Sequence, residues 1–216
     1  MEWIGNIPEN WSVKPIKSLF SFGKGLPITK ADLRPSGIKT ISYGQVHAKY
    51  NKSAFIDEQL YRFVESRYLQ TNADSLVKKG DFIFADTSED IEGSGDFVYI
   101  DIDDLIFAGY HSLVLKSLSS SDNKYLAYLF MSSLWKRQLW REVYGIKVFS
   151  ITRSLISKTT AILPPLDEQH QIADYLDKKC ADIDNLIKIK QQKIEKLQEY
   201  KKSLIYEYVT GKKEVA

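Results

Sequence analysis

The chain has 216 residues, 44% of them hydrophobic, which is enough for a buried core. Its 30 basic and 28 acidic side chains leave a formal net charge of +2, which excludes a polybasic, histone-like mode of binding nucleic acid. Cys180 is the single cysteine, so a disulfide framework is excluded. No stretch reaches the roughly 18 apolar residues of a membrane helix, and residues 1–5 show neither the basic nor the apolar region typical of a signal peptide. We expect a soluble, cytoplasmic protein without a membrane partner.

Residues 1–163 predict an α+β globule that is rich in short strands. Residues 13–22 carry apolar side chains at helical or strand-edge spacing, and the glycines at 23 and 25 end them. Apolar and β-branched residues bounded by turn residues mark the later strands. These strands are expected at residues 38–46, 75–77, 82–85, 97–100, 106–108 and 112–115.

The pattern becomes helical after the serine-rich residues 119–121. Asp122 is expected to cap a helix that Gly145 ends, because apolar residues recur at three- and four-residue intervals between them. Two short strands are then expected around residues 157–163.

The last part of the chain predicts one long helix. Pro164 and Pro165 form a corner, and neither glycine nor proline follows until Gly211. A helix over about residues 167–209 would be about 65 Å long. A seven-residue repeat places apolar side chains along one stripe of it, interrupted at Lys190 and Lys201. The candidate dimerisation residues on this stripe are Leu176, Ile183, Ile187, Ile194, Leu197 and Leu204.

A single helix with such a stripe is unstable alone in water, so it requires a partner surface. A second copy of the chain provides one through antiparallel pairing about a two-fold axis. The alternative is that the helix folds back on its own domain.

The sequence offers few groups for catalysis. The three histidines lack metal-pair spacing, and no phosphate-binding loop or dinucleotide fingerprint is present. Four carboxylates near a predicted strand end are the candidates for a Mg²⁺-dependent nuclease, namely Asp81, Asp86, Glu89 and Asp90. The Glu-x-Lys or Asp-x-Lys that such a site needs does not follow. We expect a non-catalytic chain without metal or cofactor, and the nuclease is the less favoured alternative.

Several segments together resemble one known family. Residues 164–169 (PPLDEQ), followed by Ile172, Ala173 and Leu176, closely resemble the entry to the conserved helical region of type I restriction-modification specificity subunits. Residues 7–11 (IPENW) resemble the opening of their target-recognition domains, and residues 80–85 (GDFIFA) resemble a recurrent strand. The segments 108–112, 145–152 and 204–212 also match in kind. The resemblance spans nearly the whole chain.

The resemblance implies a DNA target-recognition domain over residues 1–163 and a conserved helix over residues 164–216. In this family the subunit reads DNA and does no chemistry itself. Two recognition domains each read half of a split target, and two helices hold them apart. Methyltransferase subunits dock on the helices and methylate adenine, and an ATP-driven restriction subunit can join.

This chain carries one recognition domain and one helix, where the full subunit has two of each. It is therefore expected to be a half-subunit, or a piece of a two-domain subunit, that acts as a homodimer or pairs with a second half-subunit. A structural or inhibitory half-subunit, which occupies the methyltransferase without reading a target, is the alternative from another class.

Loops with hydrogen-bonding and basic side chains are the candidates for contacts with double-stranded DNA. The first group follows a predicted strand and comprises Gln45, His47, Lys49, Tyr50, Asn51 and Lys52. The second group comprises Tyr110, His111, Lys147 and Arg153, and the third comprises Lys24 and Lys30. Side-chain amides suit adenine edges and lysines suit phosphates. For each residue, plain surface is the competing interpretation.

Overall fold

The computed structural model describes residues 5–49, 51, 53–118, 120–143 and 148–215 of the chain. It divides into two compact units, with the boundary between Gln171 and Ile172. The described strands and the short helices belong to the first unit, and the long helix α6 (Leu166–Val209) starts there and makes up most of the second. The expected α+β class with a long C-terminal helix is confirmed.

A four-stranded antiparallel sheet lies at the centre of the first unit. Its order is β2 (Phe20–Lys24), β10 (Ser112–Ser117), β6 (Phe82–Ala85) and β8 (Phe97–Tyr99). All of β6 is buried, as its continuous apolar run predicts for a strand covered on both faces. The aromatic rings of this sheet pack on Phe130 of α3 (Asn123–Met131), with the Phe82 and Phe130 centroids 5.2 Å apart.

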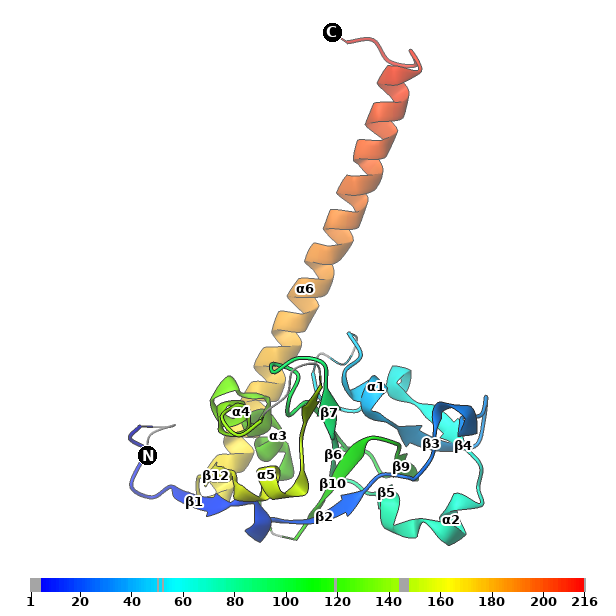
Figure 1. The fold of residues 1–216 in the computed structure, drawn as a ribbon. Helices are drawn as coiled ribbons and strands as arrows, with labels where there is room; N and C mark the ends of the chain where they lie inside the picture. Colours follow the sequence, from blue (N-terminus) through cyan, green and yellow to red (C-terminus); the bar gives the residue numbers. More distant parts are fainter. Residues whose placement is uncertain (1–4, 50, 52, 119, 144–147, 216) are drawn as a thin grey trace. The chain divides into compact units, whose positions relative to one another are not determined.

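A second four-stranded sheet has the order β4 (Arg62–Val64), β3 (Ile38–Ile41), β9 (Ile106–Ala108) and β5 (Leu76–Val77). The β3–β9 pair is parallel and the other pairs are antiparallel. The two sheets share one buried aliphatic cluster, to which each contributes. Figure 1 shows this sheet on one side of β6 and β10, and α3, α4 (Ser133–Trp140) and α5 (Arg153–Lys158) on the other.

Short elements complete the first unit. Two further sheets pair β1 (Ser12–Pro15) with β12 (Thr160–Leu163) and β7 (Thr87–Ser88) with β11 (Phe149–Ser150). The remaining helical turns are Ile16–Ser18, Lys30–Asp32, α1 (Tyr43–Val46), Glu58–Leu60, α2 (Tyr68–Thr71) and Ala73–Ser75.

The strand expected over residues 38–46 is wrong in its second half. β3 ends at Ile41, and residues 43–46 form the helical turn α1. The physical reason is a capping box, in which Ser42 caps the turn and the Gln45 side chain accepts a hydrogen bond from the Ser42 amide at 3.2 Å. The correction matters because part of the first group of candidate DNA contacts lies on this turn.

The single helix expected from Asp122 to Gly145 is also wrong. Asp122 does cap α3, but Ser132 is extended and its hydroxyl caps a second helix, α4, by accepting from the Trp135 amide at 3.2 Å. The apolar periodicity continues across the break because both helices bury one face. Residue 145 lies outside the described residues.

The two strands expected around residues 157–163 are reduced to one. Thr152 caps α5, which runs to Lys158, and only β12 is a strand. The apolar spacing of residues 13–22 was compatible with either a helix or a strand. In the structure this segment divides into β1, a 3₁₀ turn and β2.

The proline corner is held by long-range hydrogen bonds within the first unit. The Trp11 indole donates to Glu168 Oε2 at 3.1 Å. The Gln169 amide group donates to the Pro164 carbonyl at 2.7 Å and accepts from the Asp122 amide at 3.0 Å. The segments 7–11 and 164–169, distant in sequence, therefore bind each other, and Gln169 also ties the corner to the cap of α3.

Helix α6 spans 44 residues without interruption, as expected. Its acidic first turn, Asp167 and Glu168, suits the helix dipole. Of the candidate stripe, Ile183, Ile187, Ile194 and Leu197 are exposed, whereas Leu176 and Leu204 are half-buried. No helix in the described part of the chain has the length and apolarity that crossing a membrane requires.

Candidate nucleic-acid interface

The turn between β9 and β10 places two candidates of the second group, Tyr110 and His111, beside α1. The Gly109 amide donates to the Ile41 carbonyl at 2.7 Å, and a Cβ at Gly109 would lie 2.0 Å from Ser42 Oγ. This approach brings the rings of Tyr110 and His111 to 5.6 and 5.4 Å from the Tyr43 ring. His111 has a φ of 52°, a left-handed conformation in which histidine is enriched.

A pocket of about 920 Å³ opens between α1, the β7–β8 loop and this turn. It brings together three predicted contact residues, namely His47, Lys49 and His111. Its other lining residues are Tyr43, Gly44, Thr87, Ser88, Glu89, Asp90, Glu92, Gly93, Asp96 and Val148. We call this the polar pocket.

Sequence reasoning missed Tyr43 and the acidic wall of the polar pocket. Residues 92–96 alternate glycine with polar side chains, which predicted a turn and nothing more. These residues contact α1 through His47 and Asp96, which are 49 residues apart in the sequence. No local sequence pattern predicts such a long-range contact.

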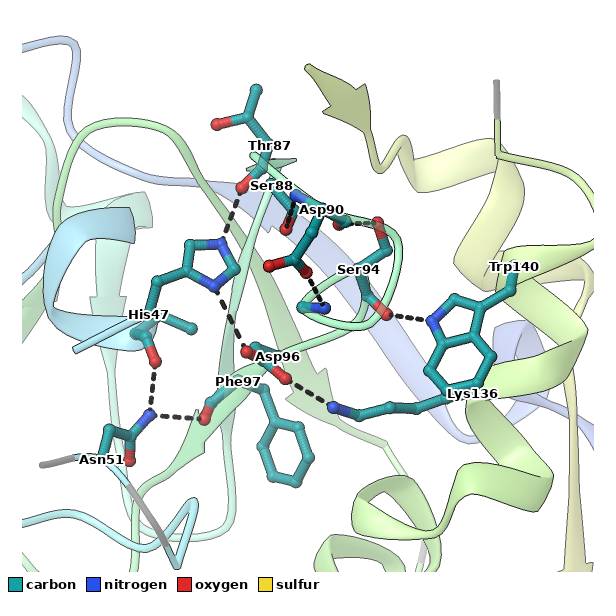
Figure 2. A network of polar contacts seen from close by, with 12 residues as sticks. His47, Asn51, Thr87, Ser88, Asp90, Ser94, Asp96, Phe97, Lys136 and Trp140 are labelled. Carbon is teal, nitrogen blue, oxygen red and sulfur yellow. Dashed lines mark hydrogen bonds and ion pairs between the residues drawn. The ribbon is translucent and has the colours of Figure 1, made fainter. Parts of the chain in front are cut away.

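A network of polar contacts joins the two walls of the polar pocket (Figure 2). His47 Nε2 lies 2.8 Å from the Thr87 carbonyl oxygen, and His47 Nδ1 lies 3.3 Å from Asp96 Oδ2. The other Asp96 oxygen accepts from Lys136 Nζ of α4 at 2.5 Å. The Trp140 indole, also on α4, donates to the Ser94 carbonyl at 2.9 Å. The β7–β8 loop is therefore anchored to α4 on one side and to α1 on the other.

The network changes the acidity of its members. Burial alone would raise the pKa of Asp96, but the hydrogen bonds from His47 and Lys136 outweigh it and lower that pKa. Burial alone would lower the pKa of His47, but the bonds with Asp96 and Thr87 outweigh it and raise that pKa above 6.5. The pair therefore favours a charged imidazole and a charged carboxylate.

Two residues of the first group use their polar atoms inside the fold. The Asn51 amide donates to the carbonyls of Val46 at 2.7 Å and Phe97 at 3.3 Å. Gln45 Oε1 accepts a hydrogen bond from the Ser42 amide, so the NH₂ group is the part of the Gln45 side chain that is left for a base contact. Lys49 is exposed at the rim. Tyr50 and Lys52 lie outside the described residues.

The remaining candidates lie elsewhere. The Arg153 guanidinium stacks 5.4 Å from the Phe22 ring centroid, in a separate hollow of about 380 Å³ that Lys17 and Leu118 also line. Lys24 ends β2 and Lys30 begins a 3₁₀ turn, both exposed and neither part of the polar pocket lining. Lys147 lies outside the described residues.

Two of the four carboxylates considered for metal binding accept backbone hydrogen bonds within the fold. Asp81, which is buried, accepts from the amides of Lys78 and Ser117 at 3.0 and 3.1 Å and so joins the turn before β6 to the end of β10. Asp90 accepts from the Gly93 amide at 2.6 Å within its own turn. Among the described residues, no group of three or more His, Cys, Asp and Glu side chains could hold a metal ion.

Comparison with known proteins assigns the fold and the family. The chain matches the family described as the type I restriction modification DNA specificity domain over residues 8–199. It is 27% identical over 212 residues to the type I restriction enzyme MjaVIII specificity subunit of Methanocaldococcus jannaschii, covering 97% of this chain and 48% of that protein. The chain therefore belongs to the family of type I restriction-modification specificity domains, and it spans about half the length of that curated relative.

Two solved structures share the fold at 14% identity. A chain from work on the assembly and conformational transition of the type I R-M system gives a TM-score of 0.69, covering 94% of this chain and 47% of that one. The HsdS subunit of Thermoanaerobacter tengcongensis gives 0.59, with 86% and 41% covered.

Proposed function

We propose that the chain reads one half of a bipartite target in double-stranded DNA and directs adenine methylation by partner methyltransferase subunits. The observation that carries this proposal is the family match across residues 8–199, which includes both the globule and most of α6. The chain itself acts as a non-catalytic subunit, and a restriction subunit joins the complex when cleavage is required.

The polar pocket and its rim support this role. Sequence readout needs donors and acceptors on a rigid scaffold, with cations nearby for phosphate. The rim offers the exposed Lys49 and the exposed His111, and Gln45 lies on the adjacent turn. The carboxylates of the wall disfavour phosphate inside the pocket, so a phosphate contact belongs to Lys49 at the rim.

Residues 164–216 supply spacing, pairing and the docking surface for the methyltransferase in this proposal. The exposed apolar residues of α6, among them Ile187 and Ile194, suit an antiparallel pair of arms in a homodimer or with a second half-subunit. Two globules at opposite ends of such a pair would face one duplex, and their half-sites would be inverted repeats.

The test is selection of duplexes from a randomised pool by the full chain, followed by affinity measurements at several salt concentrations. We expect one sequence to be enriched. The double variant Lys49→Ala with Lys52→Ala should weaken binding to all duplexes alike, and the slope of log affinity against log salt should fall by about one per lysine.

A matched control replaces Lys178 and Lys188, which are exposed on α6, by alanine. This control should keep the salt slope of the wild-type chain. Failure to enrich any sequence, with methyltransferase subunits present, would favour the inhibitory half-subunit. Mg²⁺-dependent cleavage by the purified chain would instead revive the nuclease.

A further inference from the structure

The segment 43–49, which contains α1 and one wall of the polar pocket, is held to the rest of the globule by a histidine rather than by apolar packing alone. We call it the recognition loop. We propose that His47 is a positioning residue that, as an imidazolium, fixes the recognition loop against β7 and Asp96, so that target recognition weakens when His47 loses its proton. This inference rests on the proposed function.

The geometry requires two donors on one ring. His47 Nε2 faces a backbone carbonyl oxygen at 2.8 Å and Nδ1 faces a carboxylate oxygen at 3.3 Å, and both of these oxygens accept hydrogen bonds only. A neutral imidazole carries one N–H and one lone pair. A neutral ring can therefore donate to one of the two oxygens, while its lone pair faces the second oxygen without a hydrogen bond. Only the doubly protonated ring satisfies both.

The surroundings of His47 favour the positive charge. Asp96 faces it directly, and Asp90 adds attraction from the same loop. Glu89 and Glu92 line the same pocket. The basic groups nearby are Lys136 of α4, whose ammonium is paired with Asp96, Lys49 at the rim, and the His111 imidazole of the β9–β10 turn, whose Nδ1 lies 3.3 Å from Asp86 Oδ1. Two carboxylates of the β7–β8 loop thus act on His47 directly, and two more from the same loop line the pocket.

The link is mechanical as well as electrostatic. The β7–β8 loop is fixed to α4 through Lys136 and Trp140, independently of His47. His47 is therefore a polar connection that transfers this fixed position to the recognition loop, on which Lys49 and Gln45 lie, beside the Asn51 bridge between the Val46 and Phe97 carbonyls. Loss of the proton loosens the recognition loop without releasing the β7–β8 loop, so sequence-specific contacts should suffer more than general attraction to phosphate.

The sign of the pH dependence follows from the raised pKa. A histidine whose pKa is higher in the folded chain contributes stability that is complete below its unfolded pKa of about 6.5 and is lost as pH rises through the folded value. Between about pH 6 and about pH 8.5, we expect affinity for the selected duplex to fall by about tenfold, the size of one charge-assisted hydrogen bond. Affinity for an unselected duplex should change much less.

The experiment compares the full wild-type chain with His47→Gln and His170→Gln. Glutamine at 47 has no titrating ring, so the tenfold fall assigned to His47 should be absent, and the affinity of this variant should stay near the wild-type value at high pH. His170 is exposed and lies 3.7 Å from Asp122, outside the polar pocket, so His170→Gln should keep the wild-type profile. A His47→Gln chain that retains the wild-type profile would overturn the inference.

A second measurement needs no DNA and no variant. Nitrogen-15 NMR of the imidazole rings in the wild-type chain should show both His47 nitrogens protonated at about pH 6 and a titration midpoint above 6.5, and a ring that is neutral at that pH would also overturn the inference. A protonated ring in a chain that enriches no duplex would locate the failure in the proposed function, and the link to recognition would fall with it.

Discussion

Gly25 lies where two loops cross with no room for a side chain. Its amide donates to the Ser112 carbonyl at 3.0 Å, and a Cβ at this position would lie 1.8 Å from the Gly109 carbonyl oxygen. That oxygen belongs to the backbone and already accepts from Ser112 Oγ at 2.6 Å, so it cannot move aside cheaply. The crossing sets the position of the β9–β10 turn and hence of Tyr110 and His111.

Gly25→Ala should therefore lower the free energy of unfolding by about 1–3 kcal/mol or more, the usual cost of overpacking a filled site. Urea denaturation of the full chain measures this. Gly44→Ala is the matched control, because no atom lies within 4 Å of a Cβ there and alanine is the better helix former, so stability should hold or rise by up to about 1 kcal/mol. If the two variants were equally stable, the close approach of Gly25 to the Gly109 carbonyl would be contradicted.

At the same scale, the sequence predicted which residues are polar and near the surface, but not how they are used. His47 and Asn51 were expected to contact DNA. Their partners, Thr87, Asp96 and Phe97, lie 40 to 49 residues away in sequence. A side chain's internal hydrogen bonds depend on such long-range neighbours, so their roles could not be predicted from local pattern.

At the scale of helices and strands, strong local sequence signals were sufficient to predict the element. The apolar run of β6, the Asp122 cap of α3 and the unbroken periodicity of α6 were predicted and are confirmed. The errors lie where a single N-cap serine separates two elements, as Ser42 does before α1 and Ser132 before α4. Tertiary packing decides such breaks, because the apolar spacing on either side is compatible with both outcomes.

The exposed stripe of α6 carries the prediction that belongs to this scale. Replacing Ile187 and Ile194 by Asp places two carboxylates in the proposed seam, where burying an unpaired charge is costly. We expect the dissociation constant of the proposed homodimer to rise by at least about a hundredfold, while the circular dichroism spectrum shows that the globule stays folded. Sedimentation velocity at micromolar concentration measures it.

The matched control is Asn185→Asp with Gln192→Asp, which adds the same charge on the opposite face of the helix at exposed positions. It should remain paired. The proposed pairing through the apolar stripe of α6 would be contradicted if the Ile187→Asp, Ile194→Asp variant still formed dimers. It would also be contradicted if the wild-type chain were monomeric at all concentrations tested.

For the whole molecule, the proposed pairing through α6 would join two recognition domains, each reading one half of a split target. If the arms separate the two globules by about 40–65 Å, the half-site centres lie about 12–19 base pairs apart at about 3.4 Å per base pair. In the proposed assembly the helix sets the spacing of the target, and the polar pocket with its rim reads each half-site. Changes in the globule should alter the half-site sequence, whereas changes in α6 should alter spacing or assembly.

Methylome sequencing of cells that carry this chain with its methyltransferase subunits tests the central claim, that the chain selects the DNA to be methylated. We predict methylated adenines within one bipartite motif, with half-sites in inverted orientation and a fixed spacer, and loss of that methylation when the chain is deleted. Methylation that is unchanged by the deletion, or that follows no split motif, would contradict the account.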